Sequence, residues 1–261
     1  MGESRSSAAV VGIVSPNPGP DIGGVERFAN LLADALTKNG LPAETTSASI
    51  PEGRYSLVVT SGGQRGPKHT PRVHVYHGCW PAHMLASTEG TPQWRLKRLV
   101  QGGIRERNAG RHAERVAVSR RSAQEVRRWY GLRHVATIVN GVDCETFRPQ
   151  ARAVARRQLG IPDSARMALF VGRPESRKRP QWALRAASAL GLTLHFAGPG
   201  TLDGAVPLGA LNREDLAAAY SAADLVLAPT AYEGCSFAIL EALACRAALV
   251  TTKVGWTHDL C

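Results

Sequence analysis

The sequence predicts an α/β protein with two domains, each built around a parallel β-sheet. Short apolar runs, typical of buried strands, alternate along the chain with segments whose apolar residues recur at helical spacing. This alternation breaks off in a polar, Arg-rich stretch after Pro149 and then starts again. With 261 residues, of which 44% are hydrophobic, the chain is long enough for two small cores. We therefore expect two Rossmann-like domains, residues 1–149 and 166–261, joined by a linker over 150–165.

The first domain is predicted to open with a strand, a turn-rich loop and a helix. The strand covers residues 8–14, the loop holds several Pro and Gly residues, and the helix begins after the pair Gly23 and Gly24. Asn39 and Gly40 mark the end of this helix, because they are a common stop signal. Further strands are expected at 56–60, 73–77, 115–118 and 135–139, with a helix over 121–130.

The second domain repeats the alternation and then stops early. Its strands are expected at 168–171, 193–197, 225–228 and 247–251, and its helices at 180–190, 213–222 and 237–244. A doubly wound domain would continue with further helices and a strand. We therefore expect the second domain to be truncated, so that the chain is a fragment, a shortened product or a minimal form.

Two carboxylates eight positions apart, Glu233 and Glu241, frame the turn between a predicted strand and the helix that follows it. Unpaired N–H groups at a helix start attract anions. The residues that form this start are Gly234, Cys235, Ser236 and Phe237. A phosphate bound there would leave both carboxylates to accept hydroxyls from a sugar and a ribose. The pattern indicates a nucleotide-sugar, whereas the competing interpretation is an ordinary pair of solvated charges.

Basic residues follow the strand at 168–171. Gly172 and Arg173 leave the strand, and Lys178 closes the loop before the next helix. Open α/β sheets bind ligands at the carboxyl ends of their strands. Fixed cations at this edge would stabilise the negative charge that develops on a departing diphosphate. The alternative is that both side chains are exposed loop cations.

The segment around Glu233 and Glu241 resembles the Glu-x7-Glu motif of retaining glycosyltransferases of family 4, which have the GT-B fold. The resemblance implies that Glu233 contacts the donor sugar and that Glu241 contacts the nucleotide ribose. It also implies that Arg173 and Lys178 grip the diphosphate of a nucleotide-diphosphate sugar. The first domain would then bind the acceptor, and the second would bind the donor.

Cys235 and Ser236 depart from the family pattern, which has an aromatic or apolar residue followed by Gly. A side chain at Ser236 narrows the access of a phosphate to the backbone. A second class of protein is therefore kept open, namely a non-catalytic nucleotide-sugar-binding subunit or a truncated, inactive transferase. Such a protein would hold a nucleotide and turn nothing over.

In the first domain, the pair Gly23 and Gly24 resembles the family's glycine pair, whose backbone approaches the diphosphate and the acceptor. His77 ends a predicted strand beside Gly78, and the resemblance makes it a candidate for contact with the donor sugar. His74, on the same strand, is the alternative. Histidines at strand ends are more commonly core residues with satisfied hydrogen bonds.

The resemblance implies a retaining transfer that needs no metal and no other cofactor. A double displacement would need a nucleophilic carboxylate on the face opposite the leaving group, and nothing in the first domain indicates one. We therefore favour attack on the front face, with the departing phosphate helping to deprotonate the acceptor. The sequence has no Asp-x-Asp motif, which fits a metal-free reaction. The acceptor, the donor base and the sugar are not determined by the sequence.

The net charge of +11 indicates an acidic partner. Arg and Lys residues are concentrated between Arg95 and Arg133, where only Glu106, Glu114 and Glu125 oppose them. This stretch fits peripheral contact with an anionic membrane or an anionic acceptor, and equally a solvated face. Nucleic acid is disfavoured, because aromatic residues do not interleave with the cations.

We expect a cytoplasmic protein, for which peripheral membrane contact would be with the inner membrane surface. No apolar run is long enough to cross a bilayer, and the first residues are too polar for a secretory signal. The cysteines are odd in number and scattered, which supports neither a disulfide framework nor a zinc site.

Overall fold

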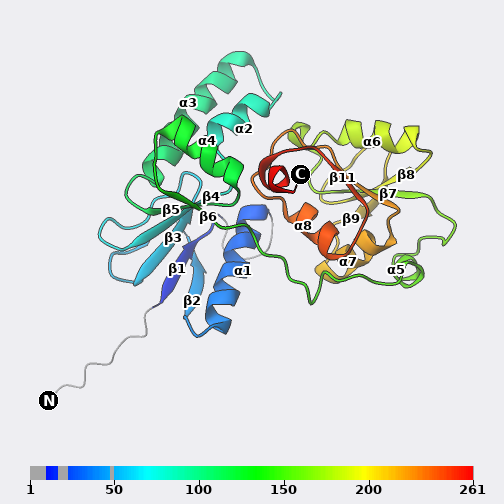
Figure 1. The fold of residues 1–261 in the computed structure, drawn as a ribbon, viewed down its shortest axis with the longest axis horizontal. Coiled ribbons are helices and arrows are strands. Elements are labelled where there is room, and N and C mark those ends of the chain that lie inside the picture. The colour runs from blue at the N-terminus through cyan, green and yellow to red at the C-terminus, as the bar shows by residue number, and fades with distance from the viewer. Residues whose placement is uncertain (1–9, 17–22, 48–49, 261) are drawn as a thin grey trace. The chain divides into compact units, whose positions relative to one another are not determined.

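The computed structural model describes residues 10–16, 23–47 and 50–260. The chain divides into two compact units after Val139, and the second unit also takes in Leu85–Gly90. Each unit contains one parallel sheet with helices around it (Figure 1). The prediction of an α/β protein with two parallel-sheet domains is confirmed.

The first sheet has the strand order β2-β1-β3-β4-β5-β6, and every neighbouring pair is parallel. Its strands are β1 (Val11–Val14), β2 (Ala43–Thr46), β3 (Leu57–Ser61), β4 (Arg72–Tyr76), β5 (Glu114–Ala117) and β6 (Val135–Thr137). Residues 8 and 9, which we expected to begin the first strand, lie outside the described residues. The sequence does not predict β2, because this edge strand is half polar and has no apolar run.

The helices described in the first part of the chain are α1 (Gly24–Lys38), α2 (Trp80–Ala86), α3 (Pro92–Ala109) and α4 (Arg120–Tyr130). The sequence predicts α1 and α4 but neither α2 nor α3. The buried positions of α3 include Gly103 and Glu106, so that it lacks the apolar face of a typical surface helix. Its start does carry a signal, since the Thr91 hydroxyl caps it by accepting from the Trp94 N–H at 3.2 Å.

The second sheet has the order β11-β10-β7-β8-β9 and is also parallel throughout. Its strands are β7 (Met167–Val171), β8 (Thr193–Ala197), β9 (Val206–Gly209), β10 (Leu225–Ala228) and β11 (Leu249–Thr251). The helices described around it are α5 (Arg152–Gln158), α6 (Pro180–Ala189), α7 (Arg213–Ala222) and α8 (Phe237–Ala244), with short 3-10 turns η1 (Ser176–Lys178) and η2 (Gly255–Asp259). The expected strands and helices of this domain are present within two residues of the predicted bounds, and β9 is additional.

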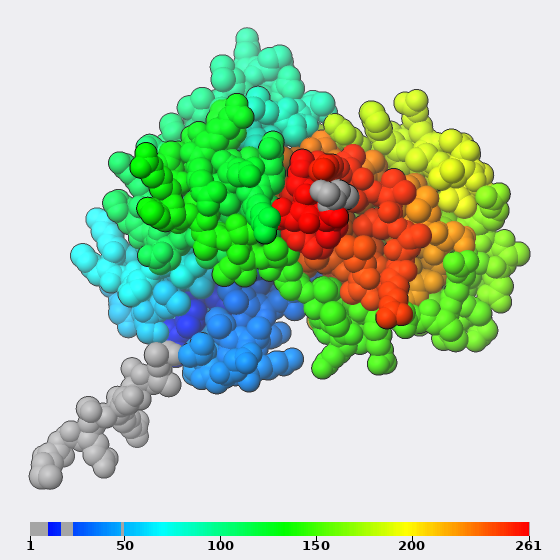
Figure 2. Space-filling model, viewed as in Figure 1, coloured from blue at the N-terminus to red at the C-terminus, as the bar shows by residue number. Residues whose placement is uncertain are grey.

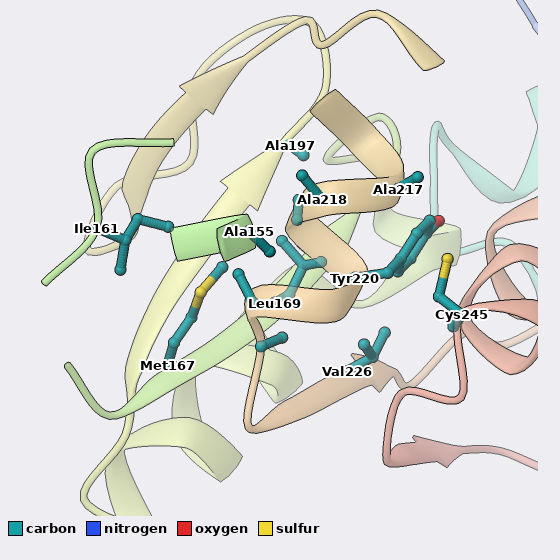
Figure 3. Close-up of a cluster of buried hydrophobic side chains, with 14 of the residues drawn as sticks. Ala155, Ile161, Met167, Leu169, Ala197, Ala217, Ala218, Tyr220, Val226 and Cys245 are labelled. Carbon is teal, nitrogen blue, oxygen red and sulfur yellow. The ribbon is translucent and has the colours of Figure 1, made fainter. Parts of the chain in front are cut away.

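The segment 150–165, which we expected to be a linker, is part of the second unit. It contains α5, whose Ala155 is fully buried in the same core cluster as Met167 and Tyr220 (Figure 3). The guanidinium of Arg156 donates to the Ala222 carbonyl at 3.1 Å. The division between the two units therefore lies near residue 140 and not at 149. The sequence does not predict α5, because this short helix is rich in Arg and has only a small apolar face.

Each sheet has one point where the strand order reverses direction. In the first sheet this point lies between β1 and β3, and in the second it lies between β7 and β10. Loops that leave neighbouring parallel strands at such a point diverge and form a crevice at the carboxyl edge, the usual ligand site of open α/β sheets. The topology thus brings together the loops after β7 and β10, which hold most of the predicted site residues.

Candidate functional site

The loops that follow β7 and β10 are bonded to each other through their backbones. The Ala231 N–H donates to the Arg177 carbonyl at 2.7 Å, and the Thr230 hydroxyl donates to the same carbonyl at 3.2 Å. Because β7 and β10 are neighbours in the sheet, both loops emerge at the same edge. The structure therefore joins two segments that the sequence separates by about fifty residues.

Glu233 is the centre of this junction. The Lys178 Nζ lies 2.6 Å from its Oε1, the Arg177 Nη1 lies 2.8 Å from the same atom, and the Thr230 hydroxyl donates to it at 3.2 Å. All three contacts converge on Oε1, so the other carboxylate oxygen, Oε2, takes no part in them. Burial by itself would raise the pKa of Glu233, but Lys178 and Arg177 outweigh burial and hold this pKa below its ordinary value.

Arg177 is a site residue that the sequence analysis did not assign. Its guanidinium lies between two carboxylates, Glu233 at 2.8 Å and Glu175 at 3.4 Å, and also donates to the Tyr232 carbonyl at 2.9 Å. Three consecutive cations end this loop, and the sequence alone could not show which of them turn inward. The turn η1 decides it, because Arg179 adopts a left-handed conformation and its guanidinium lies over the Trp182 ring.

Arg173 lies at the exposed end of the same cluster. Its side chain is 48% exposed, against 20% for Arg177, and its Nη1 lies 3.7 Å from the Glu175 carboxylate. Gly172 precedes it with a φ of +121°, a conformation that favours glycine. A Cβ added to Gly198 would lie only 2.4 Å from the Gly172 carbonyl oxygen, so the backbones after β7 and β8 are in close contact. Three cations and two carboxylates make up the cluster, which has a net positive charge.

The residues from Gly234 to Phe237 form the start of α8, as the sequence predicts. Ser236 occupies the N-cap position with an extended backbone, but within the described part of the chain its hydroxyl does not cap the helix. The Gly234 carbonyl accepts from the Trp256 N–H at 2.8 Å, and the Cys235 carbonyl accepts from the Asn140 amide at 3.1 Å. The loop is thereby fixed on both sides. Burial raises the pKa of the Cys235 thiol to about 11.

Glu241 is enclosed in the core of the second unit. Its exposed fraction is 1%, and its Oε2 accepts from the Tyr220 hydroxyl of α7 at 3.0 Å. The structure thus places Glu233 in the charged cluster and Glu241 behind it, where α8 faces α7. A role for Glu241 in binding a ribose stays a prediction.

The predicted residues of the first domain lie at the carboxyl edge of its own sheet. Gly23 is the N-cap of α1 with an extended backbone, and Gly24 is the first residue of the helix. The loop before them, residues 17–22, lies outside the described residues.

The two candidate histidines differ in their surroundings. His77 follows β4 and packs edge-on against Phe28 of α1, with ring centroids 4.6 Å apart. Its Nε2 is enclosed, and burial lowers the pKa of His77 to about 4, so the ring is neutral near pH 7. His74 lies within β4, is 0% exposed, and its Nδ1 is 2.8 Å from the Thr60 hydroxyl. His74 is therefore a core residue, and His77 is the histidine at the strand end.

Two family models match the sequence. Residues 47–146 match the model described as Glycosyltransferase Family 4, and residues 165–261 match the model described as Glycosyl transferases group 1. The chain thus carries two segments that match glycosyltransferase models, one of family 4 and one of group 1. The two matches follow each other along the chain and lie in the regions of the two parallel-sheet units.

Relatives and solved structures agree with these matches. The D-inositol 3-phosphate glycosyltransferase of Saccharomonospora viridis is 33% identical over 217 residues, which are 71% of this chain and 49% of the relative. The chain thus spans about half the length of the curated relatives it matches. Sucrose-phosphate synthase from Thermosynechococcus elongatus has a similar fold, with a TM-score of 0.77 and 20% identity over 95% of this chain and 82% of that one. Anabaena Alr3699/HepE in complex with UDP-glucose gives a TM-score of 0.67 and 18% identity over 97% and 82%.

The GT-B fold expected from the Glu-x7-Glu resemblance is confirmed by these likenesses. Among the described residues, the His, Cys, Asp and Glu side chains form no group of three that could hold a metal ion. Within the same residues, no helix combines the length and the hydropathy that a membrane span requires.

Proposed function

We propose that the chain transfers a sugar from a nucleotide-diphosphate sugar to a hydroxyl of an acceptor. The observation that carries the proposal is the ion cluster on Glu233, at the strand-order reversal of the second sheet. A site that carries net positive charge beside a helix start suits a diphosphate. The two family-model matches support a transferase, and UDP-glucose bound to the similar Anabaena fold supports a nucleotide-sugar as the donor.

The charged residues divide into those that bind the diphosphate and those that orient Glu233. Arg173, exposed at the rim, and Lys178 are the proposed diphosphate ligands, and Lys178 also contacts Glu233. Arg177 holds the Glu233 Oε1 and so fixes the carboxylate, leaving Oε2 to accept a hydroxyl of the donor sugar. Glu241 is the proposed partner of the ribose.

The proposed chemistry retains the configuration of the sugar and uses no metal. The bond between the anomeric carbon and the departing phosphate oxygen breaks, and the acceptor oxygen bonds to the same face of that carbon. The acceptor hydroxyl gives its proton to the departing phosphate, whose charge Arg173 and Lys178 stabilise. His77 is neutral near pH 7, and its uncharged imidazole is the proposed hydrogen-bond partner of a hydroxyl of the donor sugar.

Turnover of a panel of nucleotide-sugars tests the proposal. With at least one donor, the chain is expected to release nucleoside diphosphate, and Lys178→Met is expected to lower this rate by about a hundredfold, because it removes leaving-group stabilisation. Lys38→Met, at the exposed end of α1, is the matched control and should leave the rate unchanged. Binding of a donor without release of any product, in this chain and in longer forms of the protein, would favour the non-catalytic subunit instead.

We also propose peripheral contact with an anionic membrane on the cytoplasmic side, made through α3. Leu96, Val100 and Ile104 recur every four residues on this helix and are 63%, 46% and 55% exposed. Segment 92–109 lies at the surface of its unit (Figure 2). The acidic residue of α3, Glu106, is turned inward, so the exposed charges of the helix are cationic. Apolar residues flanked by cations are typical of helices that lie in the interface of an anionic bilayer.

A further inference from the structure

We propose that a pocket in the first unit binds a phosphate group carried by the acceptor. The pocket lies between α3 and the turn that follows β3, and has a volume of about 170 Å³. The residues that line it are Gly63, Trp80, Arg98, Gln101, Gly102 and Arg105. This volume is smaller than the roughly 300–1,000 Å³ of pockets for drug-sized ligands, so it suits one anionic group and a few further atoms. The identity of this group as part of an acceptor rests on the proposed transferase function.

Three polar residues line the pocket from one helix. Arg98, Gln101 and Arg105 are spaced three and four residues apart on α3, which places them on one face. Two guanidinium groups offer paired N–H donors that match phosphate oxygens, and the amide of Gln101 adds another donor. None of the described residues that line the pocket is acidic, so the lining favours an anion.

Trp80 forms a fixed wall beside these donors. Its indole Nε1 donates to the Arg98 carbonyl at 2.7 Å, and its backbone N–H donates to the Glu106 carboxylate at 2.9 Å. Glu106 is itself held by the Tyr130 hydroxyl. The indole lies directly on Gly102, where an added Cβ would come within 2.0 Å of Nε1. The wall is therefore preorganised, and it also places Arg98, whose guanidinium lies over the Trp80 ring 5.5 Å from its centroid.

The pocket lies at the functional edge of the first sheet. Gly63 follows β3, the strand that borders the strand-order reversal. A Cβ added to Gly63 would lie 3.5 Å from the Arg105 Cβ. Trp80 follows β4 by a few residues, as does His77. The same edge, where open α/β sheets bind their ligands, thus holds both the candidate contact to the transferred sugar and a separate anion pocket.

The anion face of α3 differs from its apolar stripe. Leu96, Val100 and Ile104 lie on the opposite side of the exposed surface from Arg98 and Arg105, given 100° per residue along the helix. The phosphate group could belong to a soluble polyol phosphate or to a lipid headgroup, since both present the same oxygens. The experiment therefore has one arm for each source.

Calorimetry with inorganic phosphate, glucose 6-phosphate and glucose tests the pocket directly. We expect glucose 6-phosphate to bind more tightly than glucose, and the double variant Arg98→Gln, Arg105→Gln to weaken this binding by about tenfold or more, because it removes both charge-assisted donors. Lys97→Gln, an exposed neighbour on another face, is the matched control and should stay within about twofold of the unchanged chain. Vesicles of matched charge that contain either phosphatidic acid or phosphatidylglycerol form the second arm. The arginine dependence should be larger with phosphatidic acid, whose phosphate is terminal, because the general attraction of the α3 cations to anionic lipid is the same for both.

Dependence on both arginines in either arm supports the pocket and identifies the source of the phosphate. Equal affinity of the double variant and the unchanged chain for every probe overturns it. Uridine diphosphate binding is measured in parallel, because the variants should leave it unaltered. If the unchanged chain binds glucose 6-phosphate but no nucleoside diphosphate, the result counts against the proposed transferase. If it binds a nucleoside diphosphate but not glucose 6-phosphate, the result counts against this pocket alone. Circular dichroism confirms that each variant is folded.

Discussion

At the scale of single residues, the site depends on how two cations share one carboxylate. Arg177 and Lys178 both contact the Glu233 Oε1, whose side chain is 13% exposed. A charge removed from such a pair leaves its partner partly desolvated, which costs more than the pair itself contributes. We propose that Arg177 acts on the ligand only through Glu233, as a positioning residue.

Replacing Arg177 should destabilise the second unit more than replacing Arg173. We expect Arg177→Met to lower the free energy of unfolding by about 1–3 kcal/mol. The substitution removes one of the two cations that pair with the Glu233 carboxylate and the hydrogen bond from Arg177 to the Tyr232 carbonyl. Arg173→Met, whose ion pair is exposed and 3.7 Å long, should cost less than about 1 kcal/mol. Urea unfolding measures both. Equal losses in the two variants would contradict the assigned geometry.

A second prediction at this scale concerns His74. Burial lowers the pKa of His74 to about 3, against 6.5 for an unperturbed histidine. Between these two values the unfolded chain binds a proton that the folded chain does not, so stability falls as the pH is lowered through this window. The slope from one such group approaches about 1.4 kcal/mol per pH unit. The neutral His77, with a pKa of about 4, acts in the same direction.

Urea unfolding at several pH values from 6.5 to 4 isolates this contribution. His74→Gln should lower stability near pH 7, since it disturbs the bond to Thr60, and should also flatten the dependence of the unfolding free energy on pH. An unchanged slope in the variant would show that His74 does not titrate as described.

The sequence identified most residues of the charged cluster but not their contacts. Lys178 and Glu233 were assigned to the diphosphate and the sugar from separate motifs. Their ion pair depends on two loops that meet only after the sheet has formed, as does the inward turn of Arg177. The burial of Glu241 against Tyr220 depends equally on the packing of α8 on α7. Spacing along a chain predicts none of these contacts.

At the scale of elements, η2 supports the loop that presents Glu233. Gly255 begins this turn with a φ of +51°, and a Cβ there would come within 2.1 Å of the Glu233 carbonyl oxygen. The next N–H, that of Trp256, bonds to the Gly234 carbonyl. The turn and the loop therefore fit together only with glycine at this position.

We expect Gly255→Ala to lower the unfolding free energy by about 2–4 kcal/mol, because both the backbone conformation and the contact resist a side chain. Gly160→Ala is the matched control, since Gly160 has a φ of +66° with open space around it. It should cost only about 1 kcal/mol, the price of the conformation alone. Thermal unfolding compares the two. Similar losses would show that the close approach to Glu233 is not maintained in solution.

The membrane proposal belongs to α3. The unchanged chain should sediment with phosphatidylglycerol vesicles at low salt and stay in the supernatant at high salt, because the cations of α3 contribute to the contact. The triple variant of Leu96, Val100 and Ile104 to Ser should bind several times more weakly. A control triple variant, Val154→Ser, Leu190→Ser and Val250→Ser, removes similarly exposed apolar residues from the second unit. Equal binding of both triple variants would refute a specific role of α3.

Most elements with an apolar run or a broad apolar face were predictable, whereas α3 was not, although a cap marks its start. The helix α8 has the bounds expected from Ser236 and the residues after it. By contrast, α3 buries Gly103 and Glu106 and exposes its larger apolar residues. The short helix α5 buries mainly Ala155 and an arginine, so its segment resembled a linker. In each case tertiary contacts outweigh the periodicity that sequence analysis uses.

At the scale of the whole molecule, both units place their polar side chains at the same kind of sheet edge. The reversal between β7 and β10 carries the Glu233 cluster, and the reversal between β1 and β3 borders the pocket of Arg98 and Arg105. We thus propose a diphosphate site in one unit and an anion pocket in the other, at the sheet edge that also carries His77. Each site is assembled from residues of its own unit, so each can be tested without reference to the other.

The central claim is that the loops after β7 and β10 bind a nucleoside diphosphate. Calorimetric titration of uridine, adenosine, guanosine and thymidine diphosphates tests it most directly. We expect at least one of them to bind, and Lys178→Met to weaken that binding by about tenfold or more while Lys38→Met leaves it within about twofold. The claim would be contradicted if none of the four bound to the folded chain, or if binding were the same with and without Lys178.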